Sequence, residues 1–335
     1  MKYLLITLVL LIASFNYAQE KNDWKFSAQI QLRSELDGRD FNDESYALTF
    51  ASMRSRFAVQ KSFDNSLDFM LQIQDSRVFG QENSTLANSY NLDLHQAFVR
   101  LKNPLDLPVS IQAGRFQVAY GTERFFGAVG WHYVGRAFNG VRASFDLGNF
   151  TDVFALSLRE PTGYISNPTS SLYPEIFLRE TSSSIYGFWS STNLSESQKL
   201  DFFGYHEIDR RVTVGDDYVL SQSTLGLNHI GTFGAFSNIA EAAYQFGNRG
   251  ANDVSAYLIS LQGSYKYDVF KFGVGGDILS GSSSDDLANF KENSFSVLYG
   301  TNHKFYGYMD YFINVPANTR NLGLNNFYLM FDWMP

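Results

Sequence analysis

Arginines recur in this chain at positions that alternate with apolar residues. In "ASMRSRFAVQ", Arg54 and Arg56 alternate with Met53, Ser55 and Phe57. A guanidinium group carries paired planar donors that match a carboxylate, so several of them on one surface attract anions. The basic residues on the polar side of such alternating segments are Lys25, Arg33, Arg54, Arg56, Arg100, Arg115, Arg142 and Arg159.

Acidic residues share this polar side, and they leave a second interpretation open. They are fewer than the bases, and other acids gather in the polar segments between the alternating ones. The same-side acids are Asp68, Asp146, Glu241 and Asp332. The basic surface is therefore either an anion-attracting lining or one side of structural ladders in which arginines pair with acids.

The elements that position these charges are predicted to be β-strands. In "KFSAQIQLR", Phe26, Ile30 and Leu32 point one way while Gln29 and Arg33 point the other, as successive side chains of a strand must. An aromatic content of 16%, with 26 Gly against 7 Pro, also favours strands and turns over helices. We therefore predict an all-β fold.

The lengths of the connections indicate a membrane barrel. Short links alternate with longer polar segments, and short turns at one end with long loops at the other are typical of outer-membrane barrels. The short links are 61–66, 103–108, 147–150 and 266–268, and the longer segments are 34–45, 76–90 and 161–181. We expect a transmembrane antiparallel β-barrel of about 14–16 strands, with 14 if residues 280–322 form a single long loop.

The cost of placing charge in lipid sets which side of each strand faces inward. An arginine on the lipid face near the bilayer midplane loses about 2–4 kcal/mol, so the arginine side should face the lumen. A secreted β-sandwich or β-helix would also alternate, but a sandwich must expose one face of each sheet. Here the apolar side is nearly continuous and aromatic, which favours lipid.

A slip in the pattern at Gly114 predicts a β-bulge. In "IQAGRFQVAYGTERF" the alternating apolar residues have odd numbers up to Ala113 and even numbers after Gly114. One extra residue at a glycine reverses the facing of the next part of the strand, and would turn Arg115 inward. It would turn toward lipid the residues Phe116, Val118 and Tyr120. Alternatively, Arg115 lies above the hydrocarbon zone, where exposure costs little.

The N-terminus is predicted to be a signal peptide, residues 1–18, followed by one barrel domain, 19–335. Lys2 precedes an apolar run that is too short to span a bilayer, and small or polar residues follow around Ala18. The chain has no cysteine, so it has neither disulfides nor thiolate metal sites. Its net charge of −8 argues against nucleic acid as a partner.

The stretch "QAGRFQVAYGTERFFGAVGWHYVGRAFNGVRASF" resembles the Gly-Arg strand, loop and Gly-Val-Arg strand of the alginate export family. The segments "GGDILSG" and "LYGTNHKFYGYMDYF" are similar to later parts of its bacteroidete-type members. The resemblance implies a barrel in the outer membrane of a Gram-negative bacterium. Its arginine-lined pore would pass an anionic polysaccharide such as alginate, or small anions, with outer-membrane lipid and periplasmic export proteins as partners.

The resemblance also assigns candidate residues. Arg115, Arg136 and Arg142 match the family's Gly-Arg, Gly-Arg and Val-Arg positions, and Gly121 lies in the intervening loop. The full set of candidate pore-lining or substrate-binding residues is Arg54, Arg56, Arg100, Arg115, Arg124, Arg136, Arg142, Arg159, Glu123 and Tyr120. The family continues for several further strands, whereas "GLNNFYLMFDWMP" ends after one. We therefore expect either a smaller barrel or an incomplete part of an 18-stranded one, with an open seam beside the strand at 326–334.

Other function classes have weaker support. The five histidines show no metal-ligand spacing, and no Gly-x-Ser-x-Gly elbow or phosphate-binding loop is present. We therefore predict no catalytic residues, no metal and no cofactor. A barrel enzyme with a Ser/His/Asp set in its loops, an adhesin that uses acidic loops, and a general diffusion porin stay as alternatives.

Overall fold

The computed structural model describes residues 24–38, 44, 46–63, 66–81, 91–159, 164–166, 175–177, 183–210, 220–297 and 299–334. Side chains are described for all of these except Arg159 and the residues 164–166 and 175–177. The predicted signal peptide, 1–18, lies outside the described residues. Within them, no helix is long and apolar enough to cross a membrane.

The described chain is dominated by one antiparallel sheet of 15 strands. Fourteen of them pair strictly with their neighbours along the chain, apart from a two-stranded excursion. In order, they are β1 (Lys25–Asp37), β2 (Leu48–Phe63), β3 (Leu67–Val78), β4 (Leu92–Lys102), β5 (Val109–Phe116), β6 (Phe138–Asp146), β7 (Phe150–Arg159), β10 (Ser183–Ser195), β11 (Gln198–Asp209), β12 (Leu220–Phe233), β13 (Phe236–Arg249), β14 (Asn252–Tyr267), β15 (Phe270–Leu279) and β17 (Leu324–Trp333). The sheet confirms the predicted all-β class and the lower strand number.

The remaining elements are short. The strand β16 (Lys291–Glu292) pairs in parallel with β14, while β8 (Tyr164–Ser166) and β9 (Glu175–Phe177) form a separate two-stranded sheet between β7 and β10. The short helices are η1 (Pro104–Asp106), α2 (Ser284–Ala288), η3 (Asn302–Lys304) and α3 (Val315–Asn318).

The connections alternate in length as expected, except that residues 250–251 join β13 to β14 by a tight link at the long-loop end. The links after β2, β4, β6, β10, β12 and β14 are tight, and antiparallel pairing puts them at one end of the strands. The opposite end carries the long connections, including residues 117–137 and 280–323. The stretch 280–323 is therefore one long loop rather than a further spanning hairpin.

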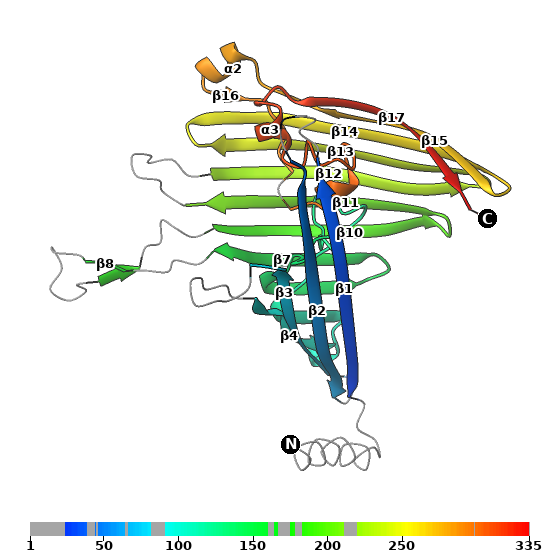
Figure 1. Cartoon of the computed structure of the whole chain (residues 1–335). Helices are drawn as coiled ribbons and strands as arrows, with labels where there is room; N and C mark the ends of the chain where they lie inside the picture. Colours follow the sequence, from blue (N-terminus) through cyan, green and yellow to red (C-terminus); the bar gives the residue numbers. More distant parts are fainter. Residues whose placement is uncertain are drawn as a thin grey trace.

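The sheet curls strongly, so that β1 and β2 pass steeply across β10–β15 in the view of Figure 1. Its outer face is apolar along every strand, with exposed side chains such as Ile30, Phe57, Leu227, Leu261 and Leu329. These are the positions that alternate with polar inward residues, as the lipid-cost argument predicts. Among the described residues, β1 and β17 each pair with one neighbour and not with each other.

The interior is filled by aromatic side chains rather than by polar ones alone. Residues 117–137, here called the crossing segment, fold inward between β5 and β6. In this segment Tyr120 stacks on Trp189 at 5.0 Å between ring centroids, and Phe125 lies 4.5 Å from Phe203. Phe126 contacts the ring of Tyr205 at 5.0 Å. This core buries large rings on the inner face, which the sequence assigned to a polar lumen.

The predicted bulge at Gly114 is wrong. The ladder runs without a shift from Arg100 opposite Gln112 to Ala97 opposite Arg115, and the irregularity lies in β4, where the pairing with β3 skips His95. Gly114 has φ of +129°, and a Cβ there would come 2.2 Å from the carbonyl oxygen of Ala97. The glycine thus permits close strand contact without changing the register.

The facing predicted for the residues after Gly114 is also wrong. Phe116, Val118 and Tyr120 are buried in the interior core instead of facing lipid. The prediction assumed that apolar residues of a strand face lipid. Here Phe116 packs inside the barrel, because the crossing segment supplies apolar side chains there. The same register leaves Arg115 on the opposite face of β5 from Phe116.

Candidate functional site

Two arginines of the inner wall converge on one glutamine at the short-turn half of the interior. Gln112 of β5 accepts through its Oε1 from Arg100 Nη2 of β4 at 2.6 Å and from Arg142 Nη2 of β6 at 2.9 Å. The three residues lie directly opposite one another in the ladder, so strand pairing fixes their spacing. An amide oxygen carries no charge, and therefore it orients the guanidinium groups without neutralising them.

Each of these arginines lines a different cavity. A cavity of about 550 Å³ is bounded by Lys25, Asp68, Met70, Phe98 and Arg100 among others. A second cavity, of about 500 Å³, has the following among its lining residues: Tyr120, Arg142, Asp146, Asp152, Trp189, Ser191 and Lys199. Bases outnumber acids in both linings taken together. The excess of bases lies in the first lining, which contains Arg100, whereas the second lining contains Arg142 and Lys199 against Asp146 and Asp152.

Tyr120 is one of the lining residues of the second cavity. Its hydroxyl donates to Oδ2 of Asp152 at 2.6 Å, and Arg142 Nη1 approaches the same oxygen at 3.3 Å. The other oxygen, Oδ1, is buried and has no hydrogen-bond partner among the described residues. The predicted residues Tyr120 and Arg142 are therefore brought together, through an aspartate that the sequence did not single out.

Arg54 and Arg56 lie higher on the wall and bind backbone rather than a cavity. Arg54 Nη1 donates to the carbonyl of His132 at 2.7 Å, and Arg56 Nη2 donates to that of Val134 at 3.1 Å. Arg33 of β1 donates to the carbonyl of Trp131 at 2.7 Å. Three arginines of the wall thus hold the carbonyls of Trp131, His132 and Val134 in the crossing segment.

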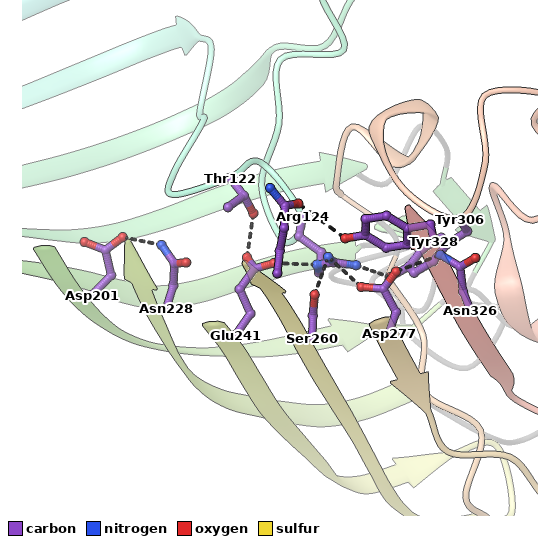
Figure 2. Close-up of polar contacts among 11 residues, drawn as sticks. Thr122, Arg124, Asp201, Asn228, Glu241, Ser260, Asp277, Tyr306, Asn326 and Tyr328 are labelled. Carbon is purple, nitrogen blue, oxygen red and sulfur yellow. Dashed lines mark hydrogen bonds and ion pairs between the residues drawn. The ribbon is translucent and has the colours of Figure 1, made fainter. Parts of the chain in front are cut away.

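Arg124 lies on the opposite side of the interior, in a fully packed ion cluster (Figure 2). Its Nε donates to Glu241 at 2.6 Å, and its Nη2 donates to Asp277 at 2.9 Å and to Ser260 at 2.8 Å. Burial disfavours the charged form, but the surrounding acidic groups hold the pKa of Arg124 above its ordinary value. Since β1–β3 and β13–β15 are far apart in the sheet, the segment crosses from one wall to the other.

Glu123 and Arg136 join the crossing segment to the second long loop. Glu123 accepts from Thr301 Oγ1 at 2.6 Å and from Lys304 Nζ at 2.7 Å, both in residues 299–304. Burial favours the neutral acid, but these hydrogen bonds hold the pKa of Glu123 below its ordinary value. Arg136 donates to the carbonyls of Tyr299 and, at 3.0 Å, Gly300.

Two candidate residues lie apart from these clusters. Arg115 donates to Oδ1 of Asn139 at 3.2 Å, on the outer face and close to the long-loop end of β5, where an exposed charge costs little. The orientation is opposite to that expected from a bulge. Arg159 ends β7 with its backbone opposite Ser183, and its side chain lies outside the described residues.

Several functional groups were missed by reasoning from the sequence, among them Gln112, Asp152, Ser260 and Asp277. The sequence did contain a signal for Ser260 and Asp277, namely their distance from a short turn. Asn228 and Glu241 face each other across one short turn, and Ser260 and Asp277 across the next, so counting outward from each turn pairs them. The carbonyl partners of the wall arginines left no such signal, because they depend on how a loop folds.

The inner wall is divided by charge. Most of its bases lie on β1–β6, while its buried acids lie on β7–β16. The buried acids are Asp152, Asp201, Glu207, Asp209, Glu241, Asp277 and Glu292. Several bases keep contact with water: the exposed side-chain fraction is 16% for Arg142 and 44% for Lys199, against 2% for Glu241. No metal-binding group of three or more His, Asp or Glu residues occurs in the described part of the chain.

Comparisons with known proteins agree with this geometry. The sequence model of a family described as "Alginate export" matches residues 23–325. The fold is similar to that of OccK8 (OprE) from Pseudomonas aeruginosa, with 13% identity, a TM-score of 0.51, and coverage of 78% of this chain and 69% of that one. It is also similar to OpdO from the same organism, with 12% identity, a TM-score of 0.50, and coverage of 77% and 66%. No curated protein matches.

Proposed function

The chain belongs to the alginate export family, and on that premise we propose that it passes an anionic polysaccharide such as alginate through an arginine-lined pore. The family and the porin-like fold support a channel of the outer membrane. The proposal names the solute and the residues that attract it.

The observation that carries the proposal is the Arg100–Gln112–Arg142 bridge, whose two arginines line two cavities that together contain more bases than acids. Both guanidinium groups donate to the neutral Gln112 oxygen, and each also lies near one acid: Arg142 is 3.3 Å from Asp152, and Arg100 stands opposite Asp68 in the ladder. Two spaced groups of this kind can hand a polymer with one carboxylate per sugar from one to the next, while neither binds it tightly enough to prevent release.

The two cavities have the size of small-ligand sites, which are about 300–1,000 Å³ in proteins. Tyr120 and Trp189 contribute aromatic residues to the lining of the second cavity, and Arg142 and Lys199 contribute donors for carboxylate and hydroxyl oxygens. These are the groups that a hydroxylated, carboxylated sugar requires. A general diffusion porin has no need of such a lining.

Further parts of the proposal concern orientation and partners. We place residues 1–18 as the cleaved signal peptide and 19–335 as the barrel domain. The short-turn end would face the periplasm, so the two cavities would receive the polymer from periplasmic export proteins. Arg54, Arg56, Arg124, Arg136 and Glu123 would then act by holding the crossing segment over the path, rather than by direct contact with solute.

Planar-bilayer recording tests the proposal. In a KCl gradient we expect a reversal potential on the anion side, and block by an oligouronate at concentrations where a neutral oligosaccharide of the same length has no effect. Block should weaken as ionic strength rises, because screening shortens the reach of the arginines. A cation-selective or non-selective pore, or equal block by both sugars, would contradict the proposal.

A further inference from the structure

One residue from each of six neighbouring strands forms a continuous row across the acidic half of the inner wall. Asp201 of β11 pairs with Asn228 of β12, and the row continues by direct register through each next strand. Its members are Asp201, Asn228, Glu241, Ser260, Asp277 and Asn326. Figure 2 shows them at one level on adjacent ribbons.

The crossing segment covers two of the three carboxylates of this row, those of Glu241 and Asp277. Thr122 donates to one oxygen of Glu241, while Arg124 donates to the other and to Asp277. From the side of the second loop, the Arg124 guanidinium lies 4.0 Å from the ring centre of Phe305. The exposed fraction of the side chain is 3% for Arg124 and 1% for Asp277, so water does not reach the cluster.

The charges in the cluster do not balance. One guanidinium faces two carboxylates, and the remaining acceptor positions are filled by neutral donors such as Asn326 at 2.9 Å. Without the segment, the middle of the acidic half-wall would therefore show two negative charges to the lumen, opposite the arginines of β4 and β6.

We propose that Arg124 determines the charge selectivity of the pore by masking Glu241 and Asp277, not by lining the path. The inference rests on the proposed function, since it explains how a lumen with so many acids still favours anions. The acids are not removed from the wall but covered by a loop that carries its own cation. Arg124 is thus a positioning residue whose loss creates a cation-attracting patch.

The test begins with Arg124→Met, which keeps the apolar stem and removes the charge. Two buried carboxylates without a cation are strongly destabilised, so the segment should lift and let water in. In a KCl gradient at about 0.1 M, where screening is moderate, we expect the anion preference to fall several-fold. In Arg124→Met/Glu241→Gln/Asp277→Asn the row is neutral, and the preference should return to the wild-type value.

The triple variant distinguishes a role of Arg124 in covering Glu241 and Asp277 from a role in lining the path of the solute. If Arg124 attracted anions directly, the triple variant would stay as shifted as the single one, and the proposal would be overturned. The matched control Glu241→Gln/Asp277→Asn removes the same acids while Arg124 is present, and it should not reduce the anion preference, because no carboxylate of the cluster is left to be exposed even if the segment lifts. Heat-modifiable migration in gels checks that each variant is folded.

Labelling gives a readout that does not depend on ion selectivity. The chain has no cysteine, so Ser260→Cys creates a unique thiol within the row. An impermeant methanethiosulfonate should react slowly with it in the otherwise wild-type protein and at least tenfold faster once Arg124 is Met. Fast labelling while Arg124 is present would show that the row is accessible to water and would refute the proposal that Arg124 covers it. A wild-type pore without anion preference but with this labelling pattern would refute only the proposed function.

Discussion

Replacing Arg100 and Arg142 by Gln should reduce the anion preference of the pore by an amount that Coulomb's law sets. Both guanidinium groups border cavities and share the neutral Gln112 oxygen, and the substitution removes one positive charge at each position while the nearby acids Asp68 and Asp152 stay in place. Gln preserves polarity and much of the side-chain length. The change therefore tests charge more than packing.

The size of the change in anion preference depends on the distance between the solute ion and each guanidinium group and on screening by salt. An anion passing about 7 Å from one guanidinium gains about 0.6 kcal/mol at the dielectric constant of water, and about 0.3 kcal/mol in 0.1 M salt. A cation loses the same amount, so removing both charges changes the anion-to-cation ratio by about 1.2 kcal/mol, or roughly sevenfold. In 1 M salt the same change is less than about twofold.

The assay is the reversal potential in a tenfold KCl gradient at low and at high ionic strength. Arg115→Gln is the matched control, because it removes an arginine on the outer face of the same sheet region and should leave the reversal potential unchanged. The reasoning is refuted if the double variant keeps wild-type selectivity at about 0.1 M, where screening leaves the difference measurable, or if Arg115→Gln shifts it equally.

Three further predictions concern the crossing segment and its supports. Because the pKa of Glu123 is lowered in the folded state, its bond to Lys304 is complete above the ordinary pKa of about 4.3 and is lost as pH falls through the lower folded value. Channel noise recorded during acidification should therefore rise only at pH values below the ordinary pKa of a glutamate, and Glu123→Gln should show that noise at neutral pH without a pH step. Gly114→Ala should destabilise the barrel by about 1–3 kcal/mol in urea unfolding, since its Cβ meets the Ala97 carbonyl at a positive φ; an unchanged midpoint would contradict the strain. Tyr120→Phe should cost about 1–3 kcal/mol in the same assay, because a buried carboxylate loses a donor, and an equal loss on Tyr120→Leu would instead point to the aromatic stacking.

The sheet itself could be predicted from the sequence because lipid imposes a simple rule. Every strand that spans the bilayer must show an apolar outer side, and residues such as Ile30 and Phe57 do so with a period of two. The tight links also indicated which ends of the strands meet. These signals are local, so a single sequence suffices to read them.

The interior could not be predicted in the same way. Phe116 and Val118 are as apolar as any lipid-facing residue, and only the fold of the crossing segment shows that their partners are inside. Arg54 was predicted to line the pore from the alternating pattern and Arg124 from the family resemblance, yet Arg54 binds a carbonyl and Arg124 binds a pair of acids on the far wall. Contacts between residues so far apart along the chain left no mark in the local pattern.

The crossing segment is fixed at both ends to walls that face each other, and this has a mechanical consequence. Arg54 fastens it to β2 at His132, and Arg124 fastens it to β13 and β15, so it acts as a strut across a curved shell. Lateral pressure from the bilayer that flattens the shell must stretch or compress this strut. Membrane tension and thickness would thereby place mechanical force on the hydrogen bonds that hold the crossing segment in the path. The passage of solute would then depend on the state of the surrounding lipid.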